Sequence, residues 1–173
     1  MFVFGRSHKS ASAKGEVREG EPLKYHLNLV DDLKEQQDKI YADYKVLALA
    51  VNARDKTAVE SFLVAFKKTW HRYLKEKNIK LYGYLKHNAR LNAQQTMDVN
   101  GARTGSNQLT CKLNRFLAAY LIDEKLDFRH TSFESLEYSL RELGEELIAS
   151  MRMERARLFP LYESCTTLQS PAV

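Results

Sequence analysis

The chain has 173 residues, of which 44% are hydrophobic and 28% are charged, a balance that is ordinary for a soluble globular protein. This length predicts one domain that buries a core without disulfides, and the net charge of +5 is modest. Because no recognised motif accompanies that charge, we do not expect a nucleic-acid partner.

Cysteines and apolar runs indicate where the chain resides. Cys111 and Cys165 are far apart and have no Cys or His partner at metal-ligand spacing, which excludes a disulfide framework and favours a reducing cytoplasm. No apolar run approaches the length of a membrane-spanning helix. The N-terminal "MFVF", residues 1–4, is too short for the apolar core of a signal peptide. It is either a tip that touches a membrane or, as we prefer, a loosely packed terminus.

Four amphipathic helices are predicted between two tails. Residues 1–22 are polar with mixed charge and read as a flexible N-terminal tail, and residues 164–173 read as a C-terminal tail. Residues 23–163 form the bundle. Within them, apolar residues recur at gaps of three and four, which predicts helices over about 28–53, 57–90, 105–125 and 132–162.

Local signals mark the helix ends. Thr57 with Glu60, and Thr131 with Glu134, have the spacing of capping boxes at the starts of the second and fourth helices. The breaker-rich stretch "DVNGARTGSN", residues 98–107, predicts either a loop or a sharply irregular start of the third helix.

Two further residues shape the fourth helix. Gly144 beside its apolar stripe predicts a close approach of a neighbouring helix, and Pro160 predicts a kinked or weakened end. Strand signals are nearly absent. The fold class that follows is all-α, an antiparallel up-down-up-down four-helix bundle.

Each apolar stripe contains a few polar members, and these are the candidate site. Bundle interiors are where side chains on facing helices assemble ligand and metal sites. Tyr73 and Lys77 are four residues apart, as are Ser150 and Glu154. The members of each pair therefore lie one above the other on a helix face. The five residues are Gln37, Tyr73, Lys77, Ser150 and Glu154.

The segments that carry these residues resemble a known family. "RYLKEKNIKLYGYL", "SMRMERARLFPLY" and "LVDDLKEQQDKIYADY" are similar to the second, fourth and first helices of the hemerythrin-like (HHE cation-binding) family. The resemblance covers roughly residues 28–163, and "RLFPLYE" is its most specific part. It implies a hemerythrin-like bundle with a cation held between the helices.

Departures from the family pattern argue against that cation. Where the family has His, this chain has Gln37, Tyr73 and Ser150, and where its second helix has Glu, this chain has Lys77. Only Glu154 keeps a ligand-type side chain. A di-iron site needs several imidazoles and bridging carboxylates. We therefore expect no metal and no other cofactor, and we do not expect oxygen binding or iron storage.

A lysine in the stripe has two interpretations. Because an unpaired buried charge is costly, Lys77 is expected to pair with Glu154, with Tyr73, Gln37 and Ser150 completing the hydrogen bonds. The alternative is that its stem lies along the stripe while its amine reaches water.

The function expected from these features is that of a protein-binding or regulatory module and not of an enzyme. No nucleophile with a base and no glycine-rich phosphate loop is present. From Lys67 to Arg90 the sequence has eight Lys or Arg residues against one Glu. This charge is either a basic helix packed beside acidic ones or a docking face for an acidic partner. The residues expected to form that face are Lys68, Arg72, Lys75 and Lys86.

Two alternatives remain open. "FKKTWHRYLKEKNIKLYGYL" and "LRELGEELIASMRMERARL" also resemble, more weakly, the Rsd/AlgQ family, which implies binding to the main sigma factor of RNA polymerase. A residual metal site that uses Glu154 with an off-pattern His is the second alternative.

Overall fold

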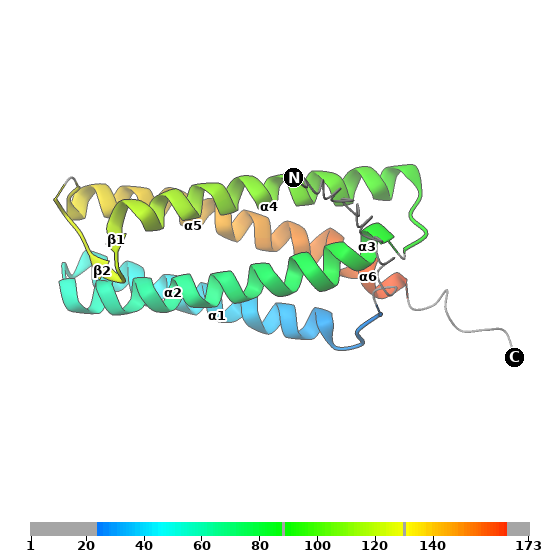
Figure 1. The fold of residues 1–173 in the computed structure, drawn as a ribbon, viewed down its shortest axis with the longest axis horizontal. Coiled ribbons are helices and arrows are strands. Elements are labelled where there is room, and N and C mark those ends of the chain that lie inside the picture. The colour runs from blue at the N-terminus through cyan, green and yellow to red at the C-terminus, as the bar shows by residue number, and fades with distance from the viewer. Residues whose placement is uncertain (1–23, 88, 130, 166–173) are drawn as a thin grey trace, which may run out of the picture.

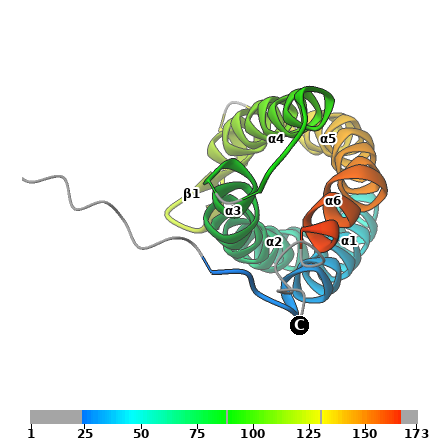
Figure 2. The same ribbon diagram turned by 90° about the vertical axis from the view of Figure 1, so that its right-hand side faces the viewer.

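The computed structural model describes residues 24–87, 89–129 and 131–165. The predicted N-terminal tail, the "MFVF" tip and most of the predicted C-terminal tail lie outside these residues. The described residues form four long helical rods side by side, which confirms an all-α four-helix bundle (Figure 1). Viewed from one end, the rods surround a common interior (Figure 2).

The first rod is the continuous helix α1, Leu29–Asn52. Asp31 and Asp32 in its first turn complement the positive end of the helix dipole. A tight turn follows, in which Arg54 has a φ of 55°. Asp55 then caps the second rod by accepting a hydrogen bond from Ala58 N at 3.0 Å. The prediction that Thr57 is the cap is therefore wrong, because the carboxylate of Asp55 already occupies that role two residues earlier.

The second rod joins three elements without a break: α2, Lys56–Glu76; the π-helical segment η1, Lys77–Tyr82; and α3, Gly83–His87. A π-helix has i→i+5 hydrogen bonds and therefore a wider turn than an α-helix. The rod ends at His87.

The third rod, α4, spans Ala93–Tyr120 and is helical throughout "DVNGARTGSN", so the prediction of a loop or irregular start there is wrong. The helix begins well before residue 105 because Asn92 and Gln95 form a capping box. Neither glycine in this stretch has a positive φ, so the breakers are accommodated as ordinary helical residues.

A short hairpin follows α4, where the sequence predicted helix to about 125. Strands β1, Leu121–Ile122, and β2, Lys125–Leu126, pair antiparallel. Asp123 and Glu124 between them both have positive φ, as the tightest hairpin turns require. Leu126 N donates to Glu60 Oε2 at 2.9 Å, which ties the hairpin to α2.

The fourth rod contains α5, Phe133–Met153; the second π-helical segment η2, Glu154–Leu158; and α6, Phe159–Ser164. Its cap is Ser132, whose hydroxyl accepts from Ser135 N at 3.2 Å, so the predicted cap at Thr131 is wrong by one residue. Helical structure continues past Pro160 to Ser164.

The core fills the space between the rods with apolar side chains. Among the buried residues, Leu33, Ile40, Phe66, Leu113 and Leu136 have no exposed surface.

One glycine allows close packing in this core. A Cβ at Gly144 would lie 2.2 Å from the Tyr44 ring. The ring of Tyr44 on α1 therefore fits against α5 only because residue 144 has no side chain. Within the described ranges, no helix has the length and apolarity needed to cross a bilayer.

Candidate functional site

Four polar side chains from three rods meet inside the bundle. Gln37 comes from α1, Tyr73 from α2, Lys77 from η1 and Glu154 from η2. Each has about 1% of its surface exposed. The structure thus brings together four of the five candidate residues predicted from the sequence.

The two charged members form a direct ion pair. Lys77 Nζ lies 2.5 Å from Glu154 Oε1. The amine also lies 4.7 Å from the centroid of the Tyr73 ring and 5.9 Å from that of Tyr82, within reach of both aromatic faces. A lysine with 1% exposure does not extend to solvent, so the snorkelling interpretation does not describe this structure.

The second carboxylate oxygen is held by neutral donors. Gln37 Nε2 donates to Glu154 Oε2 at 2.8 Å and to the Tyr73 hydroxyl oxygen at 2.8 Å. The Tyr73 hydroxyl in turn donates to Glu154 Oε2. Both oxygens of the buried carboxylate are therefore hydrogen-bonded, which compensates for its loss of hydration.

Arg155 holds this cluster from the outside. Its Nε donates to Gln37 Oε1 at 2.7 Å, and its Nη2 donates to Lys34 O at 2.9 Å and to Asp38 Oδ1 at 2.6 Å. Because the Gln37 carbonyl accepts from Arg155, its amide nitrogen is oriented inward toward Glu154. Arg155, the residue after Glu154 in the sequence, thus fixes the geometry of the hydrogen bond from Gln37 to Glu154.

Both charged residues begin a π-helical segment. Lys77 is the first residue of η1 and Glu154 the first of η2, on two different rods. Such segments are rare and occur frequently at functional sites. In the sequence, the π-helical segment of the second rod is indicated by buried residues spaced four apart. They are Tyr73, Lys77, Leu81 and Leu85. At 3.6 residues per turn such a run drifts around an α-helix, whereas a wider turn keeps its members on one face.

The enclosed charge changes the ionisation of the surrounding phenols. Burial raises the pKa of Tyr73 well above 10.0, and the negative charge of Glu154 raises it further. The pKa of Tyr82 is also raised, mainly by burial and then by Glu154. Both phenols thus remain protonated around neutral pH, and Tyr73 remains a hydrogen-bond donor to the carboxylate.

The residues present do not fit the cation that the hemerythrin-like resemblance implies. Such a site needs several imidazoles and carboxylates around the ion. Here an ammonium group lies against the single carboxylate, whose other oxygen accepts from Gln37 and Tyr73. In the described part of the chain, no three His, Cys, Asp or Glu side chains gather closely enough to hold a metal ion.

The off-pattern histidines do not supply the missing ligands. His26, His71 and His87 are all exposed, whereas Glu154 is buried. The residual metal site considered from the sequence therefore has no candidate partner among these three.

One candidate is misplaced and one buried polar residue was missed. Ser150 is half-buried, and the prediction that it joins the cluster is wrong because Met151 supplies the buried apolar side chain of that turn. Ser106 on α4 is only 2% exposed and acts to lower the pKa of Tyr82, against the larger effect of burial. It lies within residues 98–107, predicted as a loop or an irregular helix start, where no stripe position was assigned.

The four residues predicted as a partner face are all exposed. Lys68, Arg72 and Lys75 lie on α2 and Lys86 lies on α3. Lys68 Nζ lies 3.9 Å from Glu124 Oε2 beside the hairpin. The face is accessible, and its role in binding stays a prediction.

Comparisons of the chain with models of protein families, with curated proteins and with solved structures gave no match.

Proposed function

We propose that this chain is a metal-free, hemerythrin-like bundle that acts as a protein-binding or regulatory module in the cytoplasm. The observation that supports it best is the Lys77–Glu154 pair, in which an amine lies against the only carboxylate of the cluster. A charge pair enclosed in this way favours one arrangement of the rods, because separating the two charges inside the core is costly. With 1% of either side chain exposed, substrate does not reach the pair, which favours binding over catalysis.

The proposal includes an antiparallel up-down-up-down order of the rods. The arrangement in Figure 1 supports it, because the α1–α2 turn and the β1–β2 hairpin lie at one end of the bundle and α3 and α6 lie at the other. Short connections between successive rods favour antiparallel neighbours.

The proposed contact surface is the basic face formed by Lys68, Arg72, Lys75 and Lys86. An exposed cluster of one sign attracts a partner of opposite charge and accelerates its association. The partner is therefore expected to present an acidic surface. A sigma factor is the alternative that the Rsd/AlgQ resemblance supplies.

The test compares two variants with the same net charge. The face variant carries Lys68→Glu, Arg72→Glu and Lys75→Glu, and the control variant carries Lys45→Glu, Arg115→Glu and Arg141→Glu, which are also exposed positions. The Kd for a captured partner, and for purified principal sigma factor, is measured with both. Weaker binding by the face variant alone supports the proposal, and equal binding by both contradicts the assigned face.

Elemental analysis of the purified chain tests the metal-free part. Stoichiometric iron or another transition ion would overturn it. If the sigma factor fails to bind, that alternative is removed while other acidic partners remain under test.

A further inference from the structure

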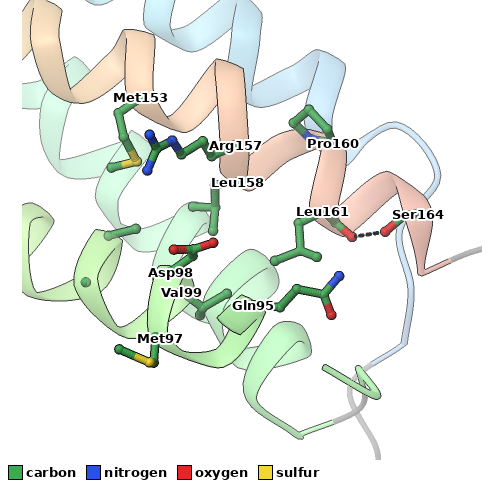
Figure 3. Close-up of a pocket in the computed structure, with 12 residues that line it drawn as sticks. Gln95, Met97, Asp98, Val99, Met153, Arg157, Leu158, Pro160, Leu161 and Ser164 are labelled. Carbon is green, nitrogen blue, oxygen red and sulfur yellow. Dashed lines mark hydrogen bonds between the residues drawn. The ribbon is translucent and has the colours of Figure 1, made fainter. Parts of the chain in front are cut away.

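A groove of about 740 Å³ runs between the N-terminal part of α4 and the segments η2 and α6 (Figure 3). Its lining is largely apolar and includes Met97, Val99, Met153 and Leu161. Met97 is 68% exposed, which is high for a large apolar side chain. Methionine side chains adapt to irregular partners and are frequent at binding surfaces. The groove is thus an apolar surface that the chain's described residues leave open.

A cation on one wall has no ion-pair partner among the described residues. Arg157 extends toward Met153 on the same wall (Figure 3) and makes no ion pair or hydrogen bond with the described residues. Its neighbour Arg155, by contrast, is fully engaged with α1. On the opposite wall, Asp98 Oδ1 accepts from Gln94 Nε2 at 3.1 Å. The two walls therefore differ in charge, and within the described ranges the cation of the η2 wall has no hydrogen-bonded partner.

The α4 wall contains a glycine in open space. A Cβ at Gly101 would meet no atom within 4 Å, and the residue has no positive φ. Glycine in the middle of a helix is less stable than alanine. Small residues let another helix approach the backbone closely. Gly144 in the core has a contact that explains it, whereas Gly101, like Gly105 outside the groove, meets no atom of the described residues and leaves the backbone of its wall open to approach.

The shape and charge of the groove select among possible occupants. A small ligand would be left largely in water beside a residue as exposed as Met97, whereas ligand pockets enclose most of their ligand. A second copy related by two-fold symmetry would set the groove against itself with no ridge to fill it, and both copies carry +5. A groove between two helices is the kind of site that accepts an amphipathic helix.

We propose that this groove binds an amphipathic helix of a partner protein, with the apolar face of that helix against Met97 and Met153 and an acidic side chain paired with Arg157. This inference rests on the proposed function as a protein-binding module and locates a second contact surface for it. Because Asp98 lies on the opposite wall, the acidic residue must face η2, which sets the rotation of the partner helix about its own axis.

The test uses a defined peptide and methyl NMR. The probe is a capped helical peptide with leucines along one face and a glutamate at its edge, and the matched probe has lysine in place of that glutamate. The full chain carries ¹³C-methyl methionine. The Met97 and Met153 signals should shift in a saturable way with the glutamate peptide, while the signal of Met151, which lies outside this groove, should not. The lysine peptide should bind at least about tenfold more weakly, because one ion pair is replaced by repulsion.

Two variants distinguish the groove from the rest of the surface. Gly101→Leu should abolish the shifts by filling the α4 wall, whereas Gly105→Leu, one turn away in equally open space and outside the groove, should leave them unchanged. Arg157→Glu should reverse the preference so that the lysine peptide binds more tightly. Circular dichroism checks that each variant remains helical.

Several outcomes would overturn this inference. They are the absence of shifts at Met97 and Met153, equal affinity for the two peptides, shifts induced by a fatty acid alone, or shifts that follow self-association on concentration. A partner that binds wild type and Gly101→Leu equally, but not the Lys68, Arg72 and Lys75 face variant, would overturn the groove while leaving the proposed function intact.

Discussion

The interior cluster and the groove between α4 and α6 differ in whether their charged groups have partners within the described chain. Inside the bundle, both oxygens of Glu154 and the Lys77 amine have partners from the chain itself. In the groove, Arg157 has none among the described residues and Met97 is mostly exposed. Buried groups must be satisfied within the fold, whereas exposed groups can remain available for another molecule. The difference separates residues that stabilise this chain from those that can serve a partner.

The largest expected effect comes from removing the buried cation of the interior cluster. Lys77→Met should lower the free energy of unfolding by about 3–5 kcal/mol, because it leaves the Glu154 carboxylate buried without its counter-charge. Urea unfolding measures the change. The exposed Lys75→Met, on the adjacent helix, is the matched control and should change stability by no more than about 0.5 kcal/mol.

The double variant Lys77→Met with Glu154→Leu should recover much of this loss, since apolar residues then replace both charges. A double-mutant coupling energy near zero would contradict a buried pair.

Removing one neutral donor should have a smaller effect. Tyr73→Phe deletes a hydrogen bond to the carboxylate and should cost about 1.5–3 kcal/mol at neutral pH. The pKa of Tyr73 in the folded chain lies above its ordinary value of 10.0, so its contribution to stability is complete below pH 10 and is lost as the pH rises through the folded pKa. Wild type should therefore lose more stability above pH 10 than Tyr73→Phe does. Urea unfolding across this range measures both slopes, and identical slopes would contradict the burial of this phenol.

Paired glycine substitutions compare core and groove directly. Gly144→Ala places a methyl group against the Tyr44 ring and should cost about 1–3 kcal/mol through overpacking. Gly101→Ala meets no atom and should instead stabilise the helix by up to about 1 kcal/mol. Thermal unfolding followed by circular dichroism gives the two signs, and equal signs would remove the distinction between the sites.

The smallest expected effect on stability is at the groove cation. Arg157→Glu breaks no contact among the described residues and should change the free energy of unfolding by no more than about 0.5 kcal/mol. A decrease in the free energy of unfolding above about 1 kcal/mol, measured with urea, would show that Arg157 stabilises the fold and would contradict its assignment to partner binding.

Regular periodicity made the four-helix architecture and most of the cluster predictable. Lys77 and Glu154 lie on apolar stripes, and a charge on a stripe requires a counter-charge, so the pairing follows from the cost of burial. Ser150 was expected on the stripe because it lies three residues after Leu147, whereas the chain buries Met151, four residues after Leu147. The prediction is wrong at this one turn only, since Leu147 and Glu154 on either side of it are buried as expected.

The irregular features could not be predicted from residue types alone, because they depend on packing between separate parts of the chain. "DVNGARTGSN" contains two glycines and reads as a break, yet the Asn92–Gln95 capping box starts the helix upstream and packing of Val99 and Ala102 maintains it. Tertiary packing here overrides local propensity. The Arg155 contacts to Gln37 and Asp38 were also not predictable, since they depend on how α1 and η2 pack together.

The two π-helical segments mark where a rod can lose a residue with the least damage. Each wide turn carries more residues than the α-helical turn it replaces. Deleting one residue between Lys77 and Leu81 would let this turn relax to α-helix with the residues after it still on the same face, so Tyr84 and Leu85 would stay in the core. The same deletion within the continuous helix α1 would turn every later residue by about 100° and move its apolar stripe off the core.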